Sequence, residues 1–437
     1  MDNVPRENRL LVYRLCCIWG LVIGSWAVLQ VTTPLVLKDI VGKEVAPTWQ
    51  GVMTATTAVS GMLFCGLVGH YSDRLGRLEF MSPWMVFFFF STVLVTFSDV
   101  FRVIYPLWVA RVAALSIPST VLHAFLSDHI SGNALLESFS YLGATFGVSM
   151  LSSSLLCGLI GWYYSRVASL MYGSCLSGIA ALLTLMTKVP GVSRFNSPVT
   201  NSKTESKAES KTEATALFRF GGVMNSLRVV CKDTLLRNLI LALALLRVGN
   251  VNTHMMLVLF VDYRLGWGLM EVSALTGISA ALAVVFQLVG IKCVVTSNVV
   301  LPVLFMTLAL APVVAAGYAM AMTGFQLYVV SLLSAMTTLA STIFNAKVAA
   351  LASDNGVAGL ALGCVGTVQN LLEIVASLFL GRLMSWSFVN YPPTHILSGL
   401  PFLVNGLFLT SVVVIVLYSH RRYGAGRVSW EEGMAVS

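Results

Sequence analysis

Long uninterrupted apolar runs are the feature that most constrains this chain of 437 residues. The hydrocarbon core of a bilayer is about 30 Å thick, and an α-helix crosses it with roughly 20 apolar residues. Twelve such runs occur, six before and six after a long polar gap. They cover residues 11–34, 50–70, 80–98, 103–126, 138–161, 167–187, 238–261, 270–290, 298–322, 325–349, 357–380 and 397–419. The sequence therefore predicts an all-α polytopic membrane protein with twelve transmembrane helices.

The composition agrees with a lipid environment. Of all residues, 57% are hydrophobic and only 11% are charged. A soluble protein of this length could not bury so much apolar surface, so its solvent must itself be apolar. No nucleotide-binding glycine pattern and no cysteine or histidine cluster with metal spacing occurs in the sequence, and the eight cysteines are expected to be packing residues. We therefore expect no cofactor, no metal and no direct use of ATP.

The basic residues predict the orientation. With both termini in the cytoplasm, 19 of the 27 Lys and Arg residues lie on the cytoplasmic side, six on the other side and two inside helices. The positive-inside rule favours this arrangement over its inverse. The first apolar run follows Arg6, Arg9 and Arg14 and lacks a small-residue cleavage site, so it is expected to be a retained helix. Because the charges are scattered over short loops, the net charge of +8 does not indicate a nucleic-acid partner.

The polar gap divides the chain. Residues 189–236 are rich in Ser, Thr, Lys and Glu, which is typical of a flexible linker. This predicts an N-terminal six-helix bundle (1–188) and a C-terminal six-helix bundle with a short cytoplasmic tail (237–437). Short similar stretches recur in the two halves, "GLVG" with "QLVG" and "LSDHISG" with "ASDNGVAG". These recurrences favour an internal duplication, and such bundles can rock about a shared cavity.

The stretch "GHYSDRLGR" concentrates charge between two apolar runs. The glycines Gly69 and Gly76 allow a tight turn and close helix approach, while Asp73 lies beside the basic residues Arg74 and Arg77. We predict a short cytoplasmic turn at 69–77. Anchoring of the topology by the arginines is an alternative, although it does not explain the glycines or the acid.

This stretch resembles the signature of the major facilitator superfamily, G-x-x-x-D-R-x-G-R-[RK]. Residues 48–77 look like the second helix and turn of the branch that contains tetracycline/proton antiporters and their eukaryotic relatives, and the similarity extends along most of the chain. The resemblance implies two pseudo-symmetric bundles, alternating access of a rocker-switch kind, and a conformational switch at Asp73 that docks near the eleventh helix. Leu78 and Glu79 depart from the signature, because Glu79 weakens the positive cluster.

Ionisable residues within apolar runs are expensive and mark function by default. The seventh and eleventh runs each place three polar residues close together on a helical face, and we predict that they form a polar cluster on a substrate or ion pathway. Pairing of Glu373 with His254 or with Arg247 would form its core. Structural ion pairs that hold the bundle together are the alternative. The cluster comprises Arg247, Asn250, His254, Gln369, Asn370 and Glu373.

Arg111 in the fourth run matches an arginine of the family, and we expect it to line the pathway. Two departures affect ion coupling. Ser25 stands where tetracycline antiporters carry a first-helix acid, and Ser153–Ser154 replace the Gly-Pro of the fifth-helix antiporter signature. Glu373 is then the best remaining proton acceptor and His254 the second. The buried side chains lean cationic, which favours an anionic or polar substrate.

The sequence supports a secondary or facilitative transporter of a small solute, with a proton as a candidate co-substrate. A transporter-like sensor or scaffold is one alternative. A polytopic membrane enzyme is another, but the sequence shows no intramembrane catalytic constellation, so we expect no enzyme activity. The partners expected are the small solute and the lipid bilayer, and the protein is expected to act as a monomer.

Overall fold

The computed structural model describes residues 6–75, 77–97, 103–111, 121–122, 133–187, 234–290, 300–354 and 358–423. These residues are almost entirely helical and include no strand. Helices are the expected secondary structure in a lipid environment, because they satisfy the hydrogen bonds of the backbone N–H and C=O groups within one segment. The predicted all-α membrane fold is confirmed.

The helices of the first half are α1 (Arg6–Val41), α2 (Ala46–Leu75), α3 (Arg77–Thr96), α5 (Asn133–Tyr163) and α6 (Arg166–Met186). Those of the second half are α9 (Thr234–Leu265), α10 (Leu269–Val285) with the π-helical turn η1 (Phe286–Gly290), α12 (Val300–Met320), α13 (Gly324–Asp354), α14 (Ala358–Asn390), the 3₁₀ turn η2 (Ile396–Gly399) and α15 (Leu400–Tyr423).

The described helices match eleven of the twelve predicted runs. Nine helices in this part of the chain are long and apolar enough to cross a membrane. The fourth run, 103–126, is described only at 103–111 and 121–122, where it is helical, so the count of twelve stays a prediction. Nearly all of the predicted linker, 189–236, lies outside the described residues. Helix α9 begins at Thr234, so residues 234–236 of the predicted linker are helical.

The predicted turn at 69–77 is wrong in its extent. Helix α2 continues to Leu75 and α3 begins at Arg77, which leaves Gly76 alone between them. Similarly, α14 runs to Asn390, well past the apolar run that ends at 380. The physical reason is that hydropathy marks the hydrocarbon layer, whereas intrahelical hydrogen bonds continue into the polar interface.

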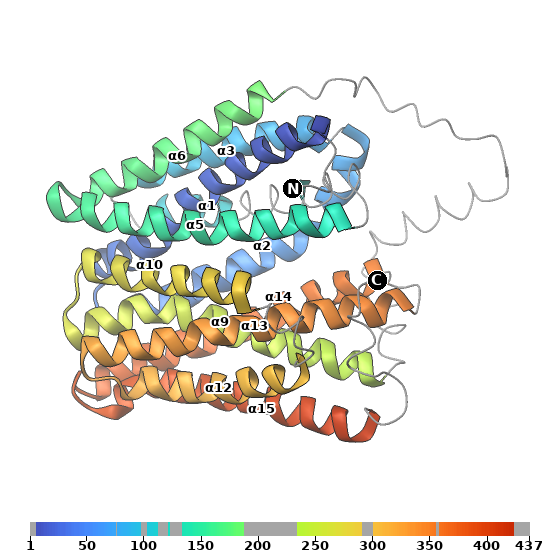
Figure 1. The fold of residues 1–437 in the computed structure, drawn as a ribbon. Coiled ribbons are helices and arrows are strands. Elements are labelled where there is room, and N and C mark those ends of the chain that lie inside the picture. The colour runs from blue at the N-terminus through green and yellow to red at the C-terminus, as the bar shows by residue number, and fades with distance from the viewer. Residues whose placement is uncertain are drawn as a thin grey trace.

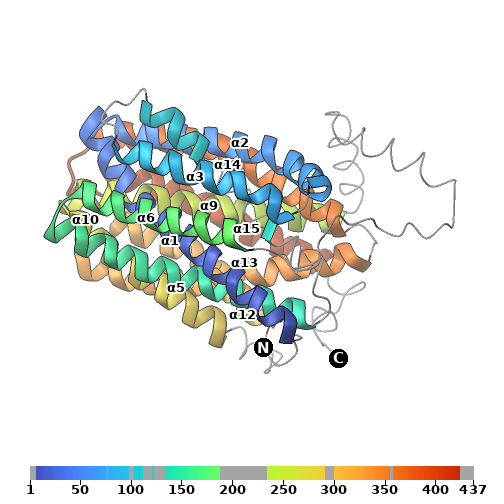
Figure 2. The same ribbon diagram turned by 90° about the horizontal axis from the view of Figure 1, so that it is seen from above.

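The helices form two groups, one for each half of the chain, that lie against each other (Figures 1 and 2). Between the groups, α2 packs along α14 and α5 packs along α10. If the fourth run counts as a helix, these are the second with the eleventh and the fifth with the eighth. Exchanging the halves turns one pair into the other, which is the relation expected of a duplicated bundle with a pseudo-twofold axis.

The packing is that of a membrane protein, with small polar side chains inside and apolar ones outside. Ser25, Thr32 and Thr92 are fully buried. The hydroxyls of Thr32 and Thr92 donate hydrogen bonds to the carbonyls of Val28 and Phe88, one turn earlier in the same helix. The exposed surface carries large apolar side chains on most helices, among them Phe90, Leu94, Leu182, Val313 and Leu407. Such a surface is stable only in contact with lipid.

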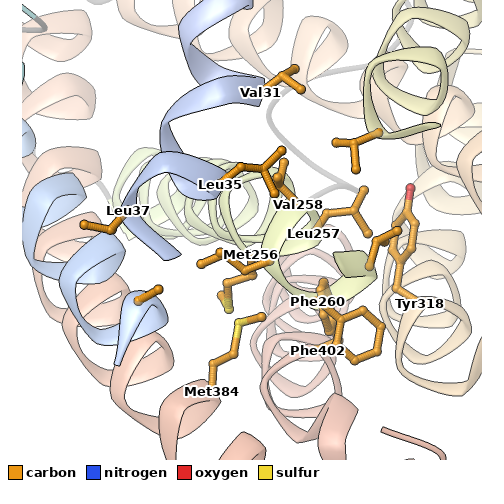
Figure 3. Close-up of a cluster of buried hydrophobic side chains, with 14 of the residues drawn as sticks. Val31, Leu35, Leu37, Met256, Leu257, Val258, Phe260, Tyr318, Met384 and Phe402 are labelled. Atoms are coloured by element: carbon orange, nitrogen blue, oxygen red, sulfur yellow. The ribbon is translucent and has the colours of Figure 1, made fainter. Parts of the chain in front are cut away.

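One end of the molecule joins the two halves through a shared core. We call it the far end, because it lies opposite the end where α1 begins and α15 finishes (on the left in Figure 1). It carries the connections 42–45, 164–165, 266–268, 321–323 and 391–395. Val31 and Leu35 of α1 face Leu257 and Val258 of α9 in one continuous buried cluster (Figure 3). The other two clusters stay within a single half.

Candidate functional site

Glu373 and Arg247 are charged residues in the middle of neighbouring helices of the second half. Glu373 on α14 is half-buried, while the Arg247 side chain on α9 is exposed although its neighbours Leu246 and Val248 are buried. The positive charge of Arg247 acts on the Glu373 carboxyl. No ion pair of 4.0 Å or less joins these two residues among those described, although their helices pack against each other. The structure therefore brings the two charged residues onto neighbouring helices without a direct salt bridge.

The remaining members of the predicted cluster do not gather at one point. The Asn370 amide faces the first half, since a Cβ added at Gly61 of α2 would lie 3.9 Å from its Nδ2. Gln369 is half-buried on the same helix. Asn250 instead lines a small cavity inside the second half, together with Thr253, Ser334 and Thr337. The His254 side chain lies outside the described part, so the pairing of Glu373 with His254 stays a prediction.

Arg111 is fully buried inside the first half. Its Nε donates a 2.8 Å hydrogen bond to the Thr92 hydroxyl, and its Nη2 donates to the Ser25 carbonyl at 3.4 Å. The guanidinium lies over the rings of Phe88 and Trp108, at 5.0 and 5.5 Å from their centroids. Within the described residues its Nη1 has no hydrogen-bond partner. The charge is held by hydroxyl, carbonyl and ring faces rather than by a described carboxylate.

The residues that depart from the antiporter pattern are packing residues. Ser153 fills the contact between α5 and α1, because a Cβ added at Gly24 would lie 2.5 Å from its hydroxyl oxygen. Ser154 is fully buried. Ser25 contributes its carbonyl to Arg111, whereas its own hydroxyl makes no hydrogen bond within the described structure.

The backbone of the charged signature is described but its side chains are not. Gly69, Asp73 and Arg74 lie in the last turns of α2, Arg77 is the first residue of α3, and Gly76 falls outside the described residues. Asp73 as a switch therefore stays a prediction. Glu79 is exposed in the first turn of α3, where a carboxylate meets the positive end of the helix dipole. The departure at this position thus has a local structural reason.

Sequence reasoning missed a set of contacts between the halves at the far end. The Lys38 ammonium of α1 pairs with the Asp262 carboxylate of α9 at 2.7 Å. The hydroxyls of Thr48 on α2 and Ser385 on α14 lie 2.9 Å apart. The available signal was that Lys38 and Asp262 carry opposite charges near the same end of the first and seventh runs.

Beside these contacts, α2, α9 and α14 enclose a small cavity between the halves. Its lining includes Gln50 and Thr54 of α2, Met256 of α9, and Ser377 and Met384 of α14. Ser377 is one turn beyond Glu373, and its hydroxyl donates to the Glu373 carbonyl at 2.6 Å. The half-buried carboxyl therefore lies one helical turn from a cavity that both halves line.

Curated proteins of known function match part of this chain. The class E and class B tetracycline resistance proteins of Escherichia coli are 26% and 24% identical over 180 and 242 residues, which is 41% and 55% of this chain. These matches span 43% and 55% of the two relatives. The chain thus matches about half the length of these relatives or less.

Solved structures share the whole fold at low identity. The nucleoside transporter NupG is 12% identical with a TM-score of 0.71, covering 94% of this chain and 99% of its own. The human organic anion transporter MFSD10 is 13% identical with a TM-score of 0.63, covering 94% and 100%. A sequence model described as the Major Facilitator Superfamily matches residues 15–377. The apolar helices, the two facing halves and this match agree: the chain is a multi-pass membrane protein that belongs to the major facilitator superfamily.

Proposed function

We propose that this protein carries a small solute across a membrane by alternating access, the two halves rocking about the region between α2, α9 and α14. The observation that carries the proposal is that Glu373, an ionisable residue in an apolar helix, lies one helical turn from a cavity that both halves line. Ionisable residues are kept at such positions where they serve a solute or ion path. The contacts at the far end hold the halves together on one side of that path.

The substrate we propose is polar or anionic. Arg111 and Arg247 are cationic and fall within the fourth and seventh apolar runs, and Arg111 has an unused donor among the described residues. Matched proteins and structures carry tetracycline resistance, nucleoside transport and organic anion transport in their names, which bounds a first panel of solutes. A monomer with cytoplasmic termini is the arrangement we expect, which places the far end on the opposite side of the membrane.

Proton coupling, if present, runs through Glu373 in this proposal. A proton-driven carrier needs a carboxyl that takes up and releases a proton in the membrane. Glu373 is half-buried on α14, which packs against α9, the helix that carries the opposite charge of Arg247. Loss of the Glu373 charge on protonation would remove one attraction between α14 and α9, which gives coupling a structural route.

The test is flux in proteoliposomes with and without an imposed pH gradient, using a panel of nucleosides, organic anions and tetracycline. We expect Glu373→Gln to remove the gradient dependence of flux while leaving the amount of inserted protein unchanged. Glu271→Gln is the matched control. The Glu271 carboxylate accepts the Gly268 N–H at the start of α10, a role that glutamine can fill, so gradient dependence should persist.

Two results would count against the proposal. Unchanged gradient dependence in the Glu373→Gln protein would rule out its proton role. Absence of flux for the whole panel, with binding of a solute retained, would favour a transporter-like sensor or scaffold.

A further inference from the structure

Lys38 and Asp262 occupy equivalent positions in the two halves. Gly42 follows the last residue of α1 with a φ of 90°, and Gly266 follows the last residue of α9 with a φ of 66°, both in the left-handed region typical of a glycine after a helix. The Gly42 N–H donates to the Lys38 carbonyl at 2.9 Å, and the Gly266 N–H donates to the Asp262 carbonyl at 3.0 Å. The two charged residues therefore stand at the same place in the first helix of each half.

Residues at equivalent positions meet only near the pseudo-twofold axis that relates the halves. The Lys38 Nζ and the Asp262 Oδ1 are 2.7 Å apart, across 224 residues of sequence. The pair consequently lies at the centre of the far end, where each half contributes one charge. A rocking motion of the two halves that opened the far end would have to separate them.

The ion pair is well enclosed without being fully dry. The Lys38 and Asp262 side chains are 16% and 11% exposed. An exposed pair would contribute little, and a fully buried one would leave a costly lone charge on separation. At this intermediate burial the pair can favour the joined state strongly, while water at its edge can receive both charges when the halves part.

Neighbouring contacts between α2 and α14 also join the two halves at the far end. The Thr48 hydroxyl donates a hydrogen bond to the Ser385 hydroxyl. Gly51 of α2 also lies against Gly381 of α14, because a Cβ added at Gly381 would lie 3.0 Å from the Gly51 Cα. These contacts are weakly polar or apolar. Lys38–Asp262 is the charged contact between the halves that the described residues provide.

We propose that Lys38 and Asp262 are gating residues of the transport cycle, forming a far-end gate whose ion pair sets the balance between the state joined at the far end and the state open there. This inference rests on the proposed alternating access. It assigns a role to two residues that lie away from the charges at Arg247 and Glu373.

The experiment measures access to the cavity behind the gate. Thr54→Cys, in the full chain with its native cysteines replaced, places a thiol in the cavity lining at a position that is 5% exposed. An impermeant maleimide is added to proteoliposomes on the side of the far end, and the labelling rate is followed. We expect Asp262→Asn and, as a second variant, Lys38→Gln to raise this rate on the order of tenfold, the size expected between exposed and buried pairs.

The chain supplies matched controls. Asp39, next to Lys38, forms an ion pair with Arg166 of α6 within the first half, so Asp39→Asn removes an adjacent ion pair that the rocking motion does not break. The labelling rate should stay at its original value. The exchange Lys38→Asp with Asp262→Lys restores opposite charges at equivalent positions and should bring the rate back.

Two results would overturn the gate. One is an unchanged labelling rate in both single variants, and the other is an equal rise in Asp39→Asn. Labelling needs no solute, so the labelling experiment tests the gate independently of transport. Faster labelling in a protein that moves no solute from the panel would support the gate and contradict transport, whereas intact flux with unchanged labelling would remove the gate alone.

Discussion

At the scale of single residues, Arg111 shows how this protein holds a charge in its buried interior. Its guanidinium is fully buried and contacts the Thr92 hydroxyl, the Ser25 carbonyl and two aromatic faces. Hydrogen bonds to charged groups are the strong ones, and a charged donor left unpaired in a dry site is costly. Thr92 is therefore a supporting residue of the arginine.

We predict that Thr92→Val lowers the free energy of unfolding by about 1–3 kcal/mol, because the Arg111 Nε–H loses its acceptor. In an Arg111→Met background the same substitution should cost much less, since no charged donor remains. Denaturant unfolding in detergent of the two single variants and the double variant measures the coupling. Equal costs of Thr92→Val in both backgrounds would show that the threonine acts through packing alone.

At the scale of elements, the halves meet where α2 and α14 bring two glycines together. A Cβ on Gly51 would lie 2.3 Å from the Ser377 carbonyl oxygen, and a Cβ on Gly381 would lie 2.7 Å from the Pro47 carbonyl oxygen. These atoms belong to the backbone and cannot turn aside. The helices can approach this closely only because neither position has a side chain.

Gly381→Ala should therefore push α14 away from α2 and destabilise the joined far end by about 1–3 kcal/mol, the usual cost of overpacking. Gly366→Ala on the same helix is the control, because a Cβ there meets nothing within 4 Å. Both substitutions gain the same helix propensity, so their difference isolates the steric effect. Thermal unfolding in detergent compares them, and equal midpoints would contradict the close approach.

At the scale of the whole molecule, the far end is where the halves are joined by core, ion pair and hydroxyl contacts at once. The Ser385 hydroxyl also donates to the Glu44 carbonyl, which ties α14 to the residues just before α2. If transport requires these contacts to part and re-form, then a covalent link across them must stop the cycle.

Cysteines at Thr48 and Ser385, whose hydroxyl oxygens are 2.9 Å apart, should cross-link on oxidation and reduce flux to near zero, with recovery on reduction. The control pair is Thr96 and Ser174, with hydroxyls 3.0 Å apart within the first half. A cross-link there joins α3 to α6 and should leave flux intact. Continued transport by the fully cross-linked Thr48–Ser385 protein would refute rocking about this end.

Sequence and structure agree on the elements and differ on their ends. Apolar runs predict the helices because a bilayer selects helices by length and hydropathy. They fail at 69–75, where polar residues extend α2 beyond the hydrocarbon layer. The pairing of Glu373 with Arg247 stays a prediction, because spacing along two helices does not determine how those helices are rotated against each other.

The sequence by itself determined that the chain is helical, that it lies in a membrane and that Arg111, Arg247 and Glu373 fall within apolar runs, because these depend on local composition and a period of 3.6 residues. Only the tertiary structure decided that Asn250 lines a cavity inside the second half, that Ser153 fills the space beside Gly24, and that Lys38 meets Asp262. Each of these depends on how helices distant in sequence are rotated and placed against one another. Helix rotation and contact across 224 residues leave no periodic trace in a single sequence.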